Sequence, residues 1–342
     1  MAEDGPGRRS PTTIYDIARA LGVSPSTVSR ALHKPGRTNA KTEQRIRAAA
    51  DALGYRINPL ARALPTGRTG TLGLILSDIT NPVWFDLIRG AERVTAEQGC
   101  TLVLAESQES PELERHTADR LVPSVDGFVL VASRLPDAEI RGLAGRKPVV
   151  AVNRAVDGVE CLVPDVAPGI RAALAHLAAA GHRSAAFLSG PATSWMSHAR
   201  WDIVFDEAPR RGLSIVEIGP GAPTMDGGAA ALRRVLASGA SAVLAYNDLM
   251  AIGLLRACRD AGVAVPGRLS IVGFDDIFGS DFTSPPITTI RTPLGALGGD
   301  AVRRLVALSR GEEPPVPAPL ATEFVHRGST APPSGGRPHD EP

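Results

Sequence analysis

One stretch near the start of the chain constrains the fold more than any other. Apolar residues recur at helical spacing from Ile14 to Leu21, which predicts an amphipathic helix over 15–21. Gly22 can adopt the positive φ that ends such a helix. The pair Ser24-Pro25 follows, with a hydroxyl that can cap a second helix and a proline suited to its first turn. Two short helices joined by a tight turn predict a helix-turn-helix, a motif whose second helix can enter the major groove of DNA.

The residues around this motif complete a small helical unit. The second helix would turn Val28 and Leu32 inward and keep a polar outer face. A third helix is predicted over 40–53, with Asn39 as its cap. A capped helix with a polar face is also common on ordinary protein surfaces, so the pattern by itself leaves DNA binding as one of two interpretations.

The distribution of charge favours DNA binding. Residues 1–68 hold 12 Lys and Arg against 5 Asp and Glu, whereas the remaining residues hold 25 against 31. The formal net charge of +1 for the whole chain therefore hides a basic head on an acidic body. Such a concentration of positive charge is typical of a protein that binds phosphate groups through one part only.

A short helix is predicted directly after this head. Asn58 can cap it, Pro59 can start it, and the residues up to Leu64 are good helix formers. This segment is far shorter than the ~12–15 residues that a helix needs to persist alone in water. We therefore expect a hinge that becomes helical only when something packs against it. The alternative is a plain linker helix.

The body of the chain alternates short apolar strands with helical patterns. Strands are predicted over 72–76, 101–105, 127–131, 149–152, 184–188, 214–218, 242–245 and 269–273. The segments between them, and 293–309, have helical periodicity. This alternation predicts doubly wound parallel α/β sheets, and two series in a row predict two lobes with a ligand cleft between them.

Composition and motifs restrict the remaining classes of function. No apolar run follows the basic start and none approaches 18 residues, so we expect neither a signal peptide nor a membrane span, and a cytoplasmic protein. The three cysteines are isolated, without a zinc or redox pair. An enzyme on a similar fold is the strongest alternative, but dinucleotide, phosphate-loop and hydrolase motifs are missing. A solute-binding protein is the second alternative, and the basic head argues against it.

Taken together, the motifs are similar to those of one protein family. In the head they are Thr13-Ile14-Tyr15-Asp16-Ile17-Ala18, Gly22-Val23-Ser24, Ser26-Thr27-Val28-Ser29-Arg30, Leu53-Gly54-Tyr55 and residues 58–64. In the body they include Val125-Asp126-Gly127, Gly181-His182-Arg183 and Gly273-Phe274-Asp275-Asp276. On these motifs the chain resembles the lactose-repressor (LacI/GalR) family. Its body resembles the periplasmic-binding-protein-like fold that serves this family as a sensing core.

The resemblance implies a ligand-responsive transcriptional regulator, in the first place a repressor that binds a palindromic DNA operator as a homodimer. The residues that would face or frame the DNA are Tyr15, Ser24, Pro25, Ser26, Thr27, Ser29, Arg30, Asn39, Ala61 and Leu64. Arg30 would make the bidentate contact to guanine that arginine favours. Leu64 would insert into the minor groove and bend the duplex. Pro65 stands where family members often have a basic residue, and so one contact would be lost.

The resemblance also implies a small-molecule effector, a sugar-like or nucleoside-like metabolite, in the cleft between the lobes. The residues implied to contact it are Asp78, Trp84, Asn153, Arg154, Ser194, Arg200, Asn247, Asp248 and Asp275. Ordinary structural roles remain open for some of them, because Trp84 can be a core residue and the aspartates can cap helices or turns. The effector would change the angle between the lobes and thereby order or melt the hinge helix. We expect no catalytic residue, no cofactor and no metal, and a bacterial protein associated with the nucleoid.

These inferences divide the chain into six parts. They are a disordered arm (1–11), the helix-turn-helix head (12–57), the hinge helix and linker (58–70), an N-terminal lobe (71–164 plus 293–320), a C-terminal lobe (165–291 plus 321–329) and a disordered tail (330–342). The chain would cross between the lobes near Pro164, Arg291 and Leu320, and a last strand over 321–326 would pair in the C-terminal lobe.

Overall fold

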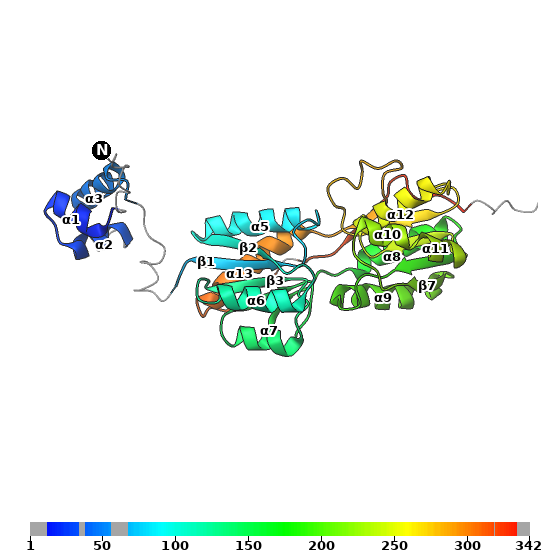
Figure 1. The fold of residues 1–342 in the computed structure, drawn as a ribbon, viewed down its shortest axis with the longest axis horizontal. Coiled ribbons are helices and arrows are strands. Elements are labelled where there is room, and N and C mark those ends of the chain that lie inside the picture. Colours follow the sequence, from blue (N-terminus) through cyan, green and yellow to red (C-terminus); the bar gives the residue numbers. More distant parts are fainter. Residues whose placement is uncertain (1–11, 34–37, 56–67, 318, 334–342) are drawn as a thin grey trace, which may run out of the picture. The chain divides into compact units, whose positions relative to one another are not determined.

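The structure is a computed structural model, and it describes residues 12–33, 38–55, 68–317 and 319–333. The chain forms two compact units, Met1–Thr69 and Gly70–Pro342 (Figure 1). We call the first the head and the second the core. The predicted arm over 1–11, the hinge helix over 58–64 and residues 334–342 of the predicted tail lie outside the described residues. The start of that tail, predicted to be disordered from residue 330, is instead ordered: Thr330 is buried, and the Ala331 amide donates to the Ser270 hydroxyl at 3.1 Å.

The head consists of three helices around a small apolar centre. They are α1 (Ile14–Leu21), α2 (Pro25–His33) and α3 (Ala40–Ala52). Ile17, Val28 and Ile46, one from each helix, are fully buried. The predicted caps are present: Gly22 ends α1 with φ 66°, and the Asn39 side chain accepts a hydrogen bond from the backbone amide of Lys41 at 3.0 Å. The helix-turn-helix prediction is therefore confirmed.

Two features at the ends of these helices differ from the prediction. α1 begins one residue early because Thr13 and Asp16 form a reciprocal capping box, in which both the Thr13 amide and its hydroxyl donate to the Asp16 carboxylate. α3 ends at Ala52, and Leu53 is 41% exposed rather than turned toward the core. The Leu53 carbonyl instead accepts a hydrogen bond from the Thr12 hydroxyl at 2.8 Å.

The first part of the core, which we call lobe 1, is a parallel sheet covered on both faces (Figure 1). Its strands lie in the order β2 (Thr101–Glu106), β1 (Thr71–Leu76), β3 (Gly127–Val131), β4 (Val149–Val152) and β5 (Glu160–Leu162). Helices α5 (Trp84–Glu97) and α13 (Leu294–Ser309) pack on one face, and α6 (Pro111–Leu121) and α7 (Asp137–Ala144) on the other. Successive residues of β3 alternate between the two faces, as the strand period of two requires. Burial on both faces explains why the central strands β1, β3 and β4 are almost entirely apolar, whereas the edge strands β2 and β5 contain polar residues.

Helices α5 and α13 approach each other closely through glycines. A Cβ atom on Gly90 would lie 2.0 Å from the Gly295 carbonyl oxygen, and one on Gly298 would lie 2.1 Å from the Leu87 carbonyl oxygen. Only glycine leaves room for this backbone contact. The last long helix of the chain thereby covers the sheet made by residues 71–162.

The second part, lobe 2, repeats the architecture with four parallel strands. Their order is β7 (Ser214–Ile218), β6 (Ser184–Leu188), β8 (Ala242–Ala245) and β9 (Ser270–Val272). Helices α8 (Ala167–Ala179) and α9 (Trp195–Glu207) cover one face, whereas α10 (Met225–Ala230), α11 (Leu232–Ala237) and α12 (Asp248–Asp260) lie on the other. A short 3-10 helix, η1 (Pro209–Arg211), follows α9. The single helices predicted over 196–211 and 227–237 are thus each divided in two.

Two short strands that join the lobes were only partly foreseen. β10 (Thr289–Arg291), which had no predicted counterpart, pairs antiparallel with β11 (Glu323–Val325), a shorter version of the strand predicted over 321–326. β10 leads directly into α13 of lobe 1, and Phe324 of β11 packs against the apolar cluster of α8 and α9. The predicted fold class is confirmed for the described residues: a helical head and a core of two parallel α/β sheets.

Candidate functional site

The outer face of the helix-turn-helix carries most of the predicted DNA contacts. Ser26 and Arg30 are exposed on α2, and Tyr15 of α1 is 64% exposed although it is aromatic. Asn39 is exposed at the start of α3, while Pro25, Thr27 and Ser29 are half-buried. Exposed groups of this kind on the three helices of the head suit contacts to base edges and phosphates. The other two predicted contacts, Ala61 and Leu64, lie outside the described residues.

Hydrogen bonds fix the start of α2. The Ser24 hydroxyl accepts the Thr27 amide at 3.2 Å and lies 2.8 Å from the Thr27 hydroxyl and 2.9 Å from the Ser26 hydroxyl. Ser24 therefore acts as the predicted cap, and the small hydroxyls around it are held in place. Arg30, one turn further along, projects from a fixed helix rather than from a flexible loop.

In the core, a small pocket brings together polar side chains from both lobes. Five predicted effector residues line it: Trp84, Asn153, Arg200, Asn247 and Asp275. The cavity has a volume of about 30 Å³, which is enough for only a few water molecules. An organic ligand therefore does not fit into this cavity in this conformation of the protein.

Lobe 2 contributes a buried ion pair to this pocket. Arg200 donates to Asp275 Oδ1 at 3.0 Å, and the two side chains are only 7% and 9% exposed. The guanidinium also donates to the Tyr246 carbonyl and lies 3.5 Å from the ring centre of Phe274, a cation–π contact. Burial raises the pKa of the Asp275 carboxyl above its usual value, and the Arg200 charge opposes this change. Arg200 thus stands between Asp275 and two aromatic residues.

Lobe 1 contributes a second pair, which the sequence did not reveal. The Arg134 guanidinium, 3% exposed, donates from two nitrogens to Glu109 Oε2 at 2.6 Å, and the Glu109 side chain is 29% exposed. Both residues line the pocket. The Arg134 amide donates to Glu114. Burial raises the pKa of the Glu114 carboxyl above its usual value, although hydrogen bonds from Ser133 and Arg134 act in the opposite direction. No motif marks Glu109 or Arg134, since each follows a different element.

Three buried polar atoms in the pocket wall have no hydrogen-bond partner among the described residues. They are Trp84 Nε1, Asn153 Oδ1 and Arg200 Nε. An unpartnered buried polar group costs about 1–3 kcal/mol, so native proteins rarely leave several together without a reason. Trp84 and Asn153 belong to lobe 1 and Arg200 to lobe 2. A ligand that spans the lobes and offers acceptors and a donor would satisfy all three.

Four other predicted effector residues do not line this pocket, and each of them has an internal partner. Asp78 accepts the Thr80 amide at 2.8 Å in a local turn, and Arg154 donates to the Ser133 carbonyl at 2.8 Å and to Asp137 at 2.6 Å. Ser194 caps α9 by accepting the Ser197 amide at 3.2 Å, although its hydroxyl also lies 3.0 Å from that of Tyr246. Their geometry fits structural roles.

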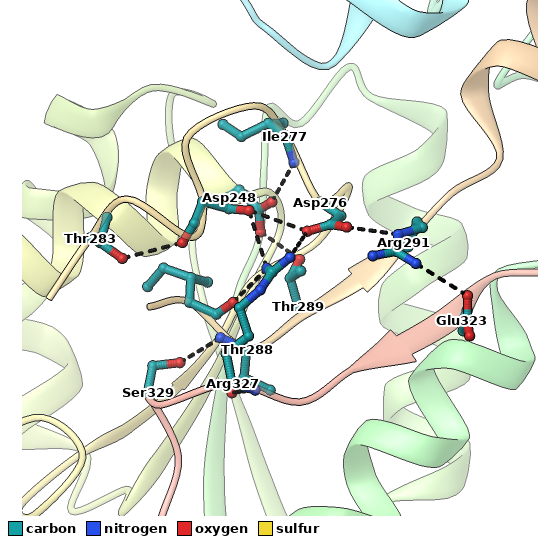
Figure 2. A network of polar contacts seen from close by, with 12 residues as sticks. Asp248, Asp276, Ile277, Thr283, Thr288, Thr289, Arg291, Glu323, Arg327 and Ser329 are labelled. Atoms are coloured by element: carbon teal, nitrogen blue, oxygen red, sulfur yellow. Dashed lines mark hydrogen bonds and ion pairs between the residues drawn. The ribbon is translucent and has the colours of Figure 1, made fainter. Parts of the chain in front are cut away.

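Asp248 is the fourth of these residues, and it is fully buried. It accepts the Thr289 hydroxyl at 2.6 Å and the Ile277 amide at 2.9 Å (Figure 2). Burial raises the pKa of Asp248 to about 8, while the Thr289 hydrogen bond acts in the opposite direction. The expected effector contact is therefore corrected to a structural link between α12, the turn at residues 275–277 and β10.

Asp276 lies in a polar network beside this link (Figure 2). Asp276 accepts from Arg327 at 2.6 Å and from Arg291 at 2.7 Å, and Arg291 also lies 3.5 Å from Glu323. Burial opposes the charge of Asp276, but the hydrogen bonds from both arginines outweigh it and hold its pKa below the usual value. Asp276 therefore remains ionised at neutral pH.

Among the described residues, no helix is long and apolar enough to cross a membrane. Among the same residues, no group of three His, Cys, Asp or Glu side chains is placed to hold a metal ion.

Comparison with known proteins gives consistent matches along the chain. Residues 13–58 match the family model described as bacterial regulatory proteins, lacI family, and residues 174–330 match that of a periplasmic-binding-protein-like domain. The transcriptional regulator AscG of Escherichia coli K12 is 32% identical over 94% of this chain and 99% of its own length. The lac repressor dimer bound to operator and the anti-inducer ONPF has a TM-score of 0.84 at 26% identity, covering 94% of this chain and 100% of that one. The complex of the transcriptional regulator CelR with cellobiose has a TM-score of 0.68 at 27% identity, covering 93% and 99%.

Proposed function

Because this chain belongs to the LacI family of bacterial transcriptional regulators, we propose that it represses transcription from a palindromic operator and responds to a small effector in the pocket between its lobes. The observation that carries the effector part is the set of three unpartnered polar atoms, contributed by both lobes to one small pocket. Binding a spanning ligand would change the lobe angle. In this proposal the hinge helix predicted over 58–64, outside the described residues, passes that change to the DNA.

The pocket favours a polyhydroxyl effector, either a sugar or a nucleoside. Carboxylates accept from ligand hydroxyls, guanidinium groups donate to ligand oxygens, and the pocket contains one pair of these from each lobe. The two pairs balance in charge, which suits a ligand without net charge. The CelR complex with cellobiose is a family precedent for a sugar. This proposal assigns the protein no catalytic role and no cofactor. The protein would act on DNA in the bacterial cytoplasm.

We further propose that the chain acts as a homodimer, so that two heads meet two half-sites. Three phenylalanines on the core surface support this: Phe85 of α5 is 47% exposed, and Phe278 and Phe282 are 72% and 71% exposed. Large exposed aromatic residues are frequent at protein interfaces. The lac repressor in the structural match is itself a dimer. Sedimentation of the variant Phe278→Asp together with Phe282→Asp should show monomers; an unchanged dimer would assign pairing to another surface.

The DNA part is tested by selecting bound duplexes from a random pool with the full-length protein. We expect a palindromic consensus with half-sites one helical turn apart. Recovery of no preferred sequence at physiological salt, with or without metabolites, would contradict the proposed function.

Arg30→Ala refines this test at the level of one base. We expect a loss of about 1–3 kcal/mol in operator binding and a relaxed preference at one position of each half-site, because a bidentate contact to guanine is removed. Arg45→Ala, which removes an exposed arginine of α3, is the matched control and should leave every base preference unchanged. If Arg30→Ala weakens binding to all sequences equally, Arg30 contacts only the backbone.

The effector part is tested by thermal-shift screening against ribose, cellobiose, other sugars and nucleosides. A compound that raises the melting temperature of the native protein should fail to do so for Asp275→Asn. Asp281→Asn, an exposed carboxylate in the following loop, is the matched control and should retain the shift. An equal shift in the Asp275 variant would remove that residue from the site.

A further inference from the structure

Two adjacent aspartates at the edge of the pocket face different partners. Asp275 lines the pocket and binds Arg200, which lies in α9 of lobe 2. Asp276 binds Arg291 at the end of β10 and Arg327 just after β11 (Figure 2). One short turn therefore connects the pocket wall to both short strands, which pack against α8 of lobe 2, and β10 leads from there into α13 of lobe 1.

We propose that Asp276 is a positioning residue that transmits movement of the pocket wall to these two strands and so sets the angle between the lobes. This inference rests on the proposed effector response and names the residue through which the response would leave the pocket. Asp276 itself contacts no effector in this proposal, since both its carboxylate oxygens are occupied by arginines and by the Ser280 hydroxyl at 3.2 Å.

The contacts around Asp276 join elements that are far apart in the sequence. Arg291 is followed within three residues by α13, which belongs to lobe 1. Arg327 also donates to the Ile287 carbonyl at 2.9 Å, and its amide donates to the Thr288 hydroxyl at 3.0 Å. Arg291 reaches Glu323 of β11 at 3.5 Å. Asp276 is thus the shared acceptor of both arginines, and its loss would remove one contact from each of two segments at once.

The turn that carries the two aspartates is itself bound to β10. The Asp275 amide donates to the Ile290 carbonyl at 2.7 Å. Asp248 accepts from the Ile277 amide and from the Thr289 hydroxyl, and so ties the far side of the turn to the same strand (Figure 2). With three points of attachment, the turn and β10 move as one piece. A displacement of Asp275 would therefore reach Asp276 and both arginines rather than being absorbed by a loose loop.

Hydrogen exchange of the full-length protein tests this without an effector or DNA. In Asp276→Asn, which keeps the side-chain shape and removes the charge, we expect exchange at residues 289–291 and 323–325 to rise by about tenfold. Asp281→Asn should leave both segments unchanged. Peptides from β6 and β8 report whether lobe 2 stays folded. If the β6 and β8 peptides also exchange faster, Asp276→Asn has disturbed the whole of lobe 2. Arg291→Lys is then used in its place, because lysine keeps the positive charge of residue 291 and lacks the Nε donor.

A double-mutant cycle tests transmission from the pocket. Arg200→Met removes the partner of Asp275, and we expect it to raise exchange at 323–325, a segment that Arg200 does not touch. In the Asp276→Asn background the same change should have no further effect there. Equal effects of Arg200→Met in both backgrounds, or unchanged exchange at the two strands in Asp276→Asn, would overturn the inference. Because no DNA is involved, failure here leaves the operator selection unaffected, and failure of that selection leaves this result standing.

Discussion

The two lobes present the same pair of groups to the pocket, an arginine and a carboxylate, but they hold these groups differently. In lobe 2, Arg200 and Asp275 are both almost fully buried. In lobe 1, Arg134 is buried while its partner Glu109 is partly in contact with solvent. The contact between Arg200 and Asp275 can break only if the residues around it move. In lobe 1, Glu109 can replace its hydrogen bonds from Arg134 with hydrogen bonds from water. The comparison suggests that lobe 1 adapts to a ligand and lobe 2 transmits its presence.

The lobes also share a feature of the backbone at these carboxylates. Glu109 has φ 59° and Asp275 has φ 104°, both in the region that residues other than glycine rarely adopt. Such a conformation costs about 1–3 kcal/mol, and it persists only where surrounding contacts impose it. In each lobe a buried acid accepts an amide hydrogen from the pocket segment: Glu114 from Arg134, and Asp248 from Ile277. The backbone around the two carboxylates is therefore held in a similar way in both lobes. The lobes differ in how deeply the carboxylate is buried, and only the lobe 2 turn is linked to β10.

The largest expected effect distinguishes Arg200 of lobe 2 from Arg134 of lobe 1. Arg200→Met should lower the free energy of unfolding of the core by about 3–5 kcal/mol, because Asp275 would remain buried without its partner. Urea denaturation measures this loss. Arg171→Met is the control, because Arg171 is more than half exposed in its ion pair with Glu207, and should cost less than about 1 kcal/mol. A small loss for Arg200→Met would mean that the Asp275 carboxylate gains access to water. The two lobes would then not differ in how they hold their ion pairs.

The second effect concerns the buried acid behind the lobe 2 turn. With its pKa raised to about 8, Asp248 keeps a proton in the folded protein that the unfolded chain releases above about pH 4. The folded state therefore loses stability as the pH rises from 5 toward 8, by at most about 1.4 kcal/mol per pH unit and roughly 2–3 kcal/mol between pH 5 and 7. Asp248→Asn should flatten this slope in unfolding curves measured across the range. If the slope is unchanged in the variant, groups other than Asp248 cause this pH dependence.

The smallest effect is expected in lobe 1. Arg134→Met should cost about 1 kcal/mol in urea denaturation, because Glu109 can turn toward water and methionine replaces most of the buried aliphatic volume. Arg146→Met, which removes one partner of an exposed lobe 1 pair with Asp119, serves as the control. A loss as large as that of Arg200→Met would erase the proposed asymmetry between the lobes.

The head was predictable because its signals are local. Gly22, Ser24 and Asn39 each act on residues two to four positions away, and the structure places all three as caps. The Thr13–Asp16 capping box is equally local, and its three-residue spacing could have been recognised. The parallel sheets of both lobes were also predictable, since apolar runs that alternate with helices form parallel sheets.

The pocket was harder to predict because its contacts join distant residues. Glu109 and Arg134 are 25 positions apart and belong to no motif. Asp248 has the sequence context of a ligand residue, yet the hydrogen bonds that occupy it come from residues 277 and 289. Burial and pairing of this kind depend on how loops meet after folding, which residue type and spacing do not encode. β10 was missed for a similar reason, since three residues carry too little periodicity.

The place of α13 in the chain has a consequence for synthesis on the ribosome. The sheet of lobe 1 is complete at residue 162, but the helix that closes one of its apolar faces spans Leu294–Ser309. At typical elongation rates roughly 7–30 s separate the two events. During that interval most of lobe 2 is made, while the valines of β3 and β4 that α13 covers remain exposed on the nascent sheet. A chaperone that binds apolar strands would find its substrate there.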